Sequence, residues 1–190
     1  MDYYKKNLKL LTENHVYSNE MEHDACGVGL IASTEGKKSR LVVEYGIEAL
    51  KAVWHRGAVD ADGKTGDGAG IHLEIPKDFF IEKIQITGHN YDNSEICVGM
   101  IFLPRNDYTS QESCKTIVES ELTKSDFSIY GWRQVPVNPK VLGEKAFLTM
   151  PEIIQVLFKS NDPNLLDKDL ERKIYEIRKK IENKALSLSL

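Results

Sequence analysis

The chain has 190 residues, 41% of them hydrophobic and 28% charged, a composition typical of a soluble globular domain with an ordinary core. Its formal net charge of -4 gives no reason to expect nucleic acid as a partner, and no apolar stretch approaches the roughly 20 residues that span a membrane. Three cysteines without C-x-x-C spacing indicate neither a disulfide framework nor a zinc site, and they predict a reducing cytoplasm.

The predicted elements begin after a polar leader, residues 1–25, which lacks the apolar centre of a secretory signal. Residues 28–32 form a short apolar run that predicts a buried strand, and a helix follows with Ser39 as its N-cap. The inner face of this helix is predicted from apolar residues at spacings of four and three: Val43, Ile47, Leu50 and Trp54. A glycine-rich loop then leads to an alternating strand at 71–75, and Pro76 opens a further helix.

Strands and amphipathic helices alternate in the second half. Residues 96–104 are apolar enough for a central strand, and a helix is predicted over 109–124. Two strand-like runs follow, at 127–137 and 151–160, and the last helix carries apolar residues at helical spacing from 166 to 181. The alternation predicts one layered α/β (α+β) domain, while leaving open whether its sheet is parallel or mixed.

The loop sequence "TGDGAG", residues 65–70, has a possible reading as a nucleotide-binding module. A P-loop requires Lys and Ser/Thr after the last glycine, where this chain has Ile71 and His72. The spacing of Asp60, Asp62 and Asp67 also fails the calcium-loop pattern. Tight turn geometry is therefore the favoured explanation of these glycines.

Cys26, in "HDACGVG", has two readings. A cysteine beside an apolar run is ordinarily a small buried hydrophobic residue, and that reading also suits Cys97, Cys114, Trp54 and Trp132 as packing residues. If the bond before Cys26 were cleaved, an α-amine of pKa about 7.7–8.0 would lie beside a thiol of pKa about 8.5. Such an amine accepts the thiol proton near neutral pH and generates the nucleophilic thiolate.

Five segments in register resemble a known family: "HDACGVG", "HRGAVDADGKTGDGAGIHLEIPKDFF", "VGMIFLP", "GWRQVPV" and "PEIIQVLF". They are similar to the N-terminal glutaminase domain of the glutamate synthase large subunit, a class II glutamine amidotransferase. The resemblance extends from about residue 22 into the last predicted helix. It implies the αββα sandwich of the N-terminal-nucleophile hydrolases, incomplete here, with residues 1–25 as a propeptide and 26–190 as the first part of the domain.

The resemblance also implies the chemistry. Cys26 matches the cysteine that becomes the mature N-terminus, with its amine as general base and its thiolate attacking L-glutamine. Arg56 matches an arginine that lies beside the nucleophile and positions it, although a structural ion pair is the alternative role. His55 is not expected to be catalytic, because in this family the amine already acts as the base.

The chain departs from the family in length. The Asn-Gly pair of the family's oxyanion hole is expected beyond residue 190, and "GHNYDN" at 88–93 does not match it. No cofactor is expected in this chain, since FMN and an iron–sulfur cluster belong to the rest of the parent enzyme. The expected partners are L-glutamine and the remaining part of glutamate synthase or a small reductase subunit. A non-catalytic fragment or complementing subunit that keeps the fold is the alternative, and missing strands would leave apolar faces uncovered.

Overall fold

The computed structural model describes residues 6, 9–10, 12–13, 27–54 and 57–190. The chain divides into two compact units. The amino-terminal unit comprises Met1–Val59 and Gly66–Ile71, and the sheet unit comprises Asp60–Thr65 and His72–Leu190. Within the described ranges, none of the helices combines the length and apolar character needed to cross a membrane.

The sheet unit is built on a three-stranded antiparallel sheet with the order β1-β3-β2. These strands are β1 (Cys97–Leu103), β2 (Phe127–Gln134) and β3 (Glu152–Ser160). The prediction that residues 96–104 form the central strand is wrong, because β3 pairs with both neighbours and β1 lies at an edge. The buried run of five residues in the middle of β3 agrees with a strand covered on both faces.

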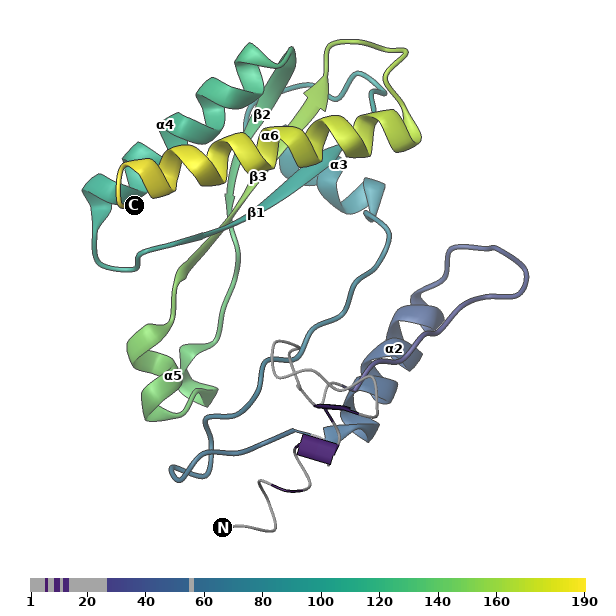
Figure 1. Ribbon diagram of the computed structural model, residues 1–190. Helices are drawn as coiled ribbons and strands as arrows, with labels where there is room; N and C mark the ends of the chain where they lie inside the picture. Colours follow the sequence, from purple (N-terminus) through teal and green to yellow (C-terminus); the bar gives the residue numbers. More distant parts are fainter. Residues whose placement is uncertain (1–5, 7–8, 11, 14–26, 55–56) are drawn as a thin grey trace. The chain divides into compact units, whose positions relative to one another are not determined.

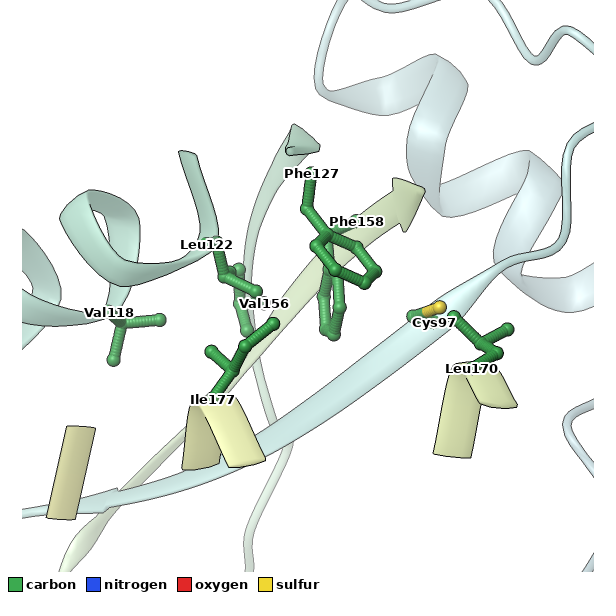
Figure 2. Close-up of a cluster of buried hydrophobic side chains, with 8 residues drawn as sticks. All are labelled: Cys97, Val118, Leu122, Phe127, Val156, Phe158, Leu170 and Ile177. Atoms are coloured by element: carbon green, nitrogen blue, oxygen red, sulfur yellow. The ribbon is translucent and has the colours of Figure 1, made fainter. Parts of the chain in front are cut away.

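Helices cover both faces of this sheet (Figure 1). On one face lie α4 (Tyr108–Lys124) and α6 (Asp167–Ser187), and on the other lies α3 (Lys77–Ile86). Figure 2 shows the first core cluster, which joins the sheet to α4 and α6 through Cys97, Val118, Leu122, Phe127, Val156, Phe158, Leu170 and Ile177. The second cluster lies under α3 and comprises Phe80, Ile84, Ile96, Tyr130 and Leu157.

The alternation of side chains along β3 explains how one strand serves both clusters. Val156 and Phe158 belong to the α4 and α6 side, whereas Leu157 between them belongs to the α3 side. On β2 the register shifts at Tyr130, and Gly131 has a φ of 146°. A Cβ at Gly131 would also lie 2.8 Å from the Cγ2 of Thr87, so the backbone and the packing both require glycine there.

The connection between β2 and β3 contains a 3₁₀ helix, η2 (Pro139–Val141), and a short helix, α5 (Glu144–Thr149). The sequence analysis predicted no helix in this connection. Asn138 caps η2 by accepting a hydrogen bond from the Lys140 N–H at 3.3 Å. Gly143 is the N-cap of α5 and is buried.

The amino-terminal unit contains α2 (Arg40–Ala52). Its predicted N-cap is confirmed, since the Ser39 side chain accepts a hydrogen bond from the Leu41 N–H at 3.2 Å. The helix ends before Trp54, whose side chain is 79% exposed, so the prediction that Trp54 continues the inner helical face is wrong. No residue of α2 is buried.

The strands predicted at 28–32 and 71–75 are not present. Val28 and Leu30 are 92% and 90% exposed, contrary to the buried strand that their run predicts. A strand needs a neighbour to accept and donate its backbone hydrogen bonds, and none pairs with either segment among the described residues. The described residues therefore show α/β content with one small sheet.

Candidate functional site

The predicted nucleophile Cys26 lies outside the described residues, and so do Arg56 and His55. The structure describes the segments that adjoin these positions, from Gly27 onward and from Gly57 onward. The candidate site is therefore described through its flanking segments, both of which begin in the amino-terminal unit.

The segment after Cys26 carries apolar side chains without packing partners. Residues 27–33 have no helix or strand, and a Cβ added at Gly29 would meet no atom within 4 Å. Val28 and Leu30 are almost fully exposed. Side-chain packing by Val28 and Leu30 therefore does not fix the backbone of residues 28–30.

The segment after Arg56 begins with a tight set of hydrogen bonds in the amino-terminal unit. The Gly57 N–H donates to the Trp54 carbonyl at 3.0 Å, and a Cβ at Gly57 would approach that oxygen to 3.3 Å. The Ala58 N–H donates to the Asp67 carboxylate at 2.9 Å, and the Asp67 N–H donates back to the Ala58 carbonyl at 3.2 Å. This reciprocal pair fixes the two ends of the loop relative to each other.

Two of the loop glycines have a clear structural cause. A Cβ at Gly66 would lie 2.8 Å from the Ala58 carbonyl oxygen, and Gly63 has a positive φ of 69°. These two positions confirm the prediction of tight turn geometry. Gly68 and Gly70 have no atom within 4 Å of an added Cβ, and no helix starts directly after them, so the loop lacks the helix N-terminus that a phosphate-binding loop uses.

The tip of the loop, residues 60–65, belongs to the sheet unit and is organised by Asp62. Its carboxylate accepts hydrogen bonds from the Thr65 hydroxyl at 2.5 Å and from the backbone N–H groups of Thr65 and Lys64 at 2.7 and 2.9 Å. These donors, the Thr65 hydroxyl above all, hold the pKa of the Asp62 carboxyl well below its usual range. Asp62 is therefore ionised at neutral pH.

The same tip contacts the start of α5 inside the sheet unit. Lys145 Nζ forms an ion pair with Asp60 Oδ2 at 2.6 Å. A Cβ at Gly143 would lie 2.5 Å from the Thr65 backbone nitrogen and nearer still to the Thr65 hydroxyl and the Asp62 carboxylate. The Glu144 backbone N–H also helps to lower the pKa of Asp62. We call these four residues, Asp60, Asp62, Gly143 and Lys145, the loop clamp.

Sequence reasoning missed the loop clamp. The Asp-x-Asp-Gly run at 60–63 is a recognisable turn signal. Its partners lie 85 residues away in the case of Lys145, and no periodic pattern links the two segments.

The other two cysteines lie in the sheet unit. Cys97 is 4% exposed, and burial raises the pKa of its thiol to about 12. Cys114 is half-buried on α4, and burial raises the pKa of its thiol too. The prediction of a core position is confirmed for Cys97, while Cys114 is only partly covered, and both thiols resist ionisation near neutral pH.

Trp132 is a core residue of the sheet unit. Trp132 packs against the first core cluster, as predicted, and its indole N–H donates to the Glu119 carboxylate at 2.7 Å. Over the part of the chain that the structure describes, no three His, Cys, Asp or Glu side chains come together in a way that could hold a metal ion.

The comparisons with known proteins all indicate the same family. The profile of the family described as Glutamine amidotransferases class-II matches residues 26–189. The glutamate synthase (NADPH) large chain of Azospirillum brasilense is 51% identical over 179 residues, which are 94% of this chain and 12% of that protein. The ferredoxin-dependent glutamate synthase of Pyropia yezoensis is 39% identical over 175 residues, 92% of this chain and 11% of that protein.

A plant protein gives a similar result. The ferredoxin-dependent glutamate synthase 1 of Arabidopsis thaliana, chloroplastic/mitochondrial, is 41% identical over 162 residues, 85% of this chain and 10% of that protein. The chain thus spans about a tenth of the length of the curated relatives that it matches.

Proposed function

The chain belongs to the class II glutamine amidotransferases, and from that membership we propose that it hydrolyses the side-chain amide of L-glutamine with Cys26 as the nucleophile. The observation that carries the proposal is the family match, which begins at residue 26, the cysteine itself. In this proposal residues 1–25 are a propeptide, and residues 26–190 are the first part of the amidotransferase domain.

The chemistry starts with scission of the bond between Ala25 and Cys26. The freed α-amine takes the thiol proton, and the thiolate attacks the carbonyl carbon of the glutamine side chain. The carbon–nitrogen bond of the tetrahedral intermediate breaks, and the ammonium group returns a proton to the departing nitrogen, so that ammonia leaves and a γ-glutamyl thioester remains. Water then attacks the thioester, releasing glutamate and restoring the thiol.

Arg56 is proposed to position the nucleophile. Its guanidinium stays charged at every relevant pH and favours a nearby thiolate over the neutral thiol. Arg56 directly precedes Gly57, where the hydrogen bond to Trp54 makes the following backbone tight. The hydrogen bond at Gly57, directly after Arg56, supports the positioning role.

The remaining thiols support the choice of Cys26. Cys97 and Cys114 both have raised thiol pKa values because they are buried or half-buried, and neither is suited to attack an amide near neutral pH. Both are free cysteines, in keeping with a reducing compartment such as the cytoplasm, where we place the reaction.

We propose that the complete fold is an αββα sandwich, in which a second β-sheet covers part of the three-stranded sheet described above. On the α3 side of β1, Met100 and Phe102 are 48% and 64% exposed, beyond the part of that face that α3 covers. Their parity along the strand places them on the same face as Val98, which packs on the second core cluster. An uncovered apolar half-face of this kind supports a further layer.

The wider context is also a proposal. We propose that the ammonia serves glutamate synthesis from 2-oxoglutarate in the rest of a glutamate synthase, where FMN and an iron–sulfur cluster would be held and a reductase subunit or other electron donor would act. The relatives named above support this context, and the share of their length that this chain covers explains why those sites would lie elsewhere.

Selective labelling tests the proposal. The protein is treated with a diazo ketone analogue of L-glutamine, and intact-mass and peptide mass spectrometry locate the adduct. We expect loss of residues 1–25, one adduct on Cys26, protection by L-glutamine, and ammonia release that the Cys26→Ala variant loses. Cys97→Ala and Cys114→Ala are the matched controls and should label as the parent protein does.

Two results would contradict the proposal. One is a protein that releases ammonia from glutamine while residues 1–25 remain attached. The other is a protein that folds but takes up no analogue at Cys26, which would favour a non-catalytic or complementing role.

A further inference from the structure

The two edge strands of the sheet differ in how they are protected against pairing with another chain (Figure 1 shows β1, β2 and β3). An edge strand presents unpaired backbone N–H and C=O groups, and proteins ordinarily protect such edges with charged residues, proline or bulges. On β2, the register shifts between Ile129 and Gly131, and the strand carries the charged residue Arg133. The edge formed by β2 is therefore a poor template for a further strand.

The edge formed by β1 has none of these protective features. Its sequence, CVGMIFL, contains no charged residue and no proline, and its register with β3 runs without a shift from Cys97 to Leu103. Met100 and Phe102 are 48% and 64% exposed. Among the described residues, no strand pairs with the outer side of β1. A regular, apolar and exposed edge of this kind is expected to take up a further strand.

The sequence of β1 and its flanks is complementary to itself. When two copies of β1 run antiparallel with Met100 opposite Met100, Val98 of each copy faces Phe102 of the other. A β-branched residue opposite an aromatic residue favours pairing. Just beyond the strand, Glu95 of each copy faces Arg105 of the other, so that opposite charges meet at both ends of the paired strands.

The neighbouring registers lack this complementarity. If Ile101 lay on the symmetry axis, Glu95 would face Asp107 of the other copy, and like charges would meet at both ends. If Gly99 lay on the axis, Glu95 would face an apolar residue. A shift of the pairing by one residue would place core-facing side chains of one copy beside outward-facing ones of the other. Charge complementarity therefore selects the register centred on Met100.

Both charged residues can reach a second copy. The Glu95 side chain is 47% exposed and binds Lys77 through Oε2 at 3.0 Å. The Arg105 guanidinium lies over the Phe147 ring at 4.6 Å from its centre, and within the described part of the chain it forms no ion pair. Arg105 is therefore available to pair with a carboxylate of a second copy.

We infer that β1 is a self-association edge, through which two copies of this chain form a symmetric dimer with one continuous antiparallel sheet. The twofold axis passes through Met100, so the same residues of both copies make the contact. This inference is independent of the proposed function, because it uses only the sheet unit. It concerns the edge of β1, whereas the further layer proposed above would lie on the α3 side of the strand, so both can be present together.

The first test measures the strength of the dimer. Sedimentation velocity of the full chain under reducing conditions, over a range of protein concentrations, gives its dissociation constant. Met100→Lys places two positive charges opposite each other on the axis and should raise this constant at least about 10-fold. Ile86→Lys is the matched control and should leave it unchanged, since Ile86 is 72% exposed but lies on α3 rather than on β1.

A charge exchange tests the ends of the paired strands. Glu95→Arg or Arg105→Glu alone places like charges opposite each other and should raise the dissociation constant by about 10-fold. An equimolar mixture of the two single variants should form a heterodimer of about the parent strength, because opposite charges then meet again at both ends. Recovery in the mixture cannot come from a repaired fold within one chain, so it reports on the contact between copies.

Disulfide trapping tests the register. Met100→Cys places two thiols opposite each other on the axis, and mild oxidation should join the copies through residue 100, as located by peptide mass spectrometry. Phe102→Cys is the matched control. Its two thiols would lie four residues apart along the paired strands, about 13 Å, which exceeds the Cα separation of about 7 Å that a disulfide can bridge.

Three results would overturn the inference. One is a parent chain that stays monomeric up to about 1 mM, where even a weak dimer would form. The others are a dimer that Met100→Lys leaves intact, and trapping through residue 102 in place of residue 100. If circular dichroism shows that Met100→Lys does not fold, the mixing and trapping experiments decide. Ammonia release from glutamine enters none of these outcomes, so failure of the proposed function would leave the inference standing.

Discussion

The two units of this protein use apolar residues in opposite ways. In the sheet unit, the apolar runs of three strands and three helices meet in two buried clusters, and Leu157 on the central strand is 0% exposed. In the amino-terminal unit, Leu30 is 90% exposed, and α2 buries no residue although its apolar spacing predicts an inner face. The difference shows that an apolar pattern defines a face, while burial depends on a partner from elsewhere in the chain.

The location of the proposed chemistry follows the same division. Cys26 and Arg56 fall in the sequence range of the amino-terminal unit, whereas both buried clusters of the described residues lie in the sheet unit. Functional segments are commonly drawn from the less stable parts of a protein, because they must adapt to a substrate. Substitutions in the two units are therefore expected to change the free energy of unfolding by different amounts.

The largest expected effect comes from truncating matched leucines. Leu157→Ala should lower the free energy of unfolding by about 2–5 kcal/mol, because it leaves a cavity between β3 and α3. Leu30→Ala should change it by less than about 0.5 kcal/mol, because that side chain is exposed. Urea unfolding followed by circular dichroism measures both. Similar losses for the two variants would mean that the amino-terminal apolar run is buried after all.

Glycine substitutions give the next largest difference. Gly131→Ala should destabilise the protein by about 1–3 kcal/mol, since its φ of 146° is strained for alanine and the new Cβ would clash with Thr87. Gly68→Ala in the loop should cause no loss, because the added methyl group meets no atom within 4 Å. Thermal unfolding by calorimetry compares the two, and tolerance of alanine at 131 would contradict the described register of β2.

The buried thiol of Cys97 predicts a dependence of stability on alkaline pH. Its pKa rises from 9.0 to about 12 on folding, so below about pH 9 the thiol is neutral in both states and its full contribution is present. As the pH rises further, the unfolded chain ionises first, and the folded state should lose about 1 kcal/mol by about pH 10. Unfolding titrations from pH 8 to pH 10 measure this loss.

The control for that titration is Cys97→Ala. This variant should be less stable at neutral pH, because it leaves a small cavity, and should show a flatter dependence on pH. An unchanged slope would show that Cys97 is not the group that titrates. A nucleophilic Cys26, in contrast, must ionise near neutral pH in the folded protein.

The smallest effect on global stability is expected from the N-cap of α2. Ser39→Ala removes the acceptor for the Leu41 N–H and should destabilise α2 locally by about 1 kcal/mol. Hydrogen exchange should accelerate in α2 while the protection of β3 stays constant, because no residue of α2 is buried. Asp107→Ala at the N-cap of α4 is the matched control and should lower the global free energy of unfolding, since α4 packs on the core.

Much of the sheet unit could be predicted from the sequence. The helix predicted over 109–124 corresponds to α4, the one opened by Pro76 to α3, and the three apolar runs to β1, β2 and β3. These predictions succeed because local periodicity and capping residues act over a few positions. The predicted strands at 28–32 and 71–75 are wrong, because a strand is completed by a partner that local periodicity does not identify.

In the candidate site, too, the sequence predicted some features and only the structure showed others. The roles of Cys26 and Arg56 come from the resemblance and stay predictions, since both residues lie outside the described part of the chain. The loop clamp could not be predicted, because a lysine at 145 and an aspartate at 60 are ordinary surface residues until the fold brings them together. In the sequence, Asp62 was recognisable only as part of a local turn motif.

The sequence by itself indicated the family, the positions of α3, α4, α6 and the three strands of the sheet unit, and the identity of the thiol proposed for catalysis. Only the tertiary structure decided that β3 is the central strand, that Cys97 is buried with a raised pKa, and that Lys145 binds Asp60. The physical reason is the separation along the sequence of the residues that interact. Hydrogen bonding and side-chain spacing within an element depend on residues a few positions apart, whereas strand order, burial and ion pairing depend on which distant segments pack together.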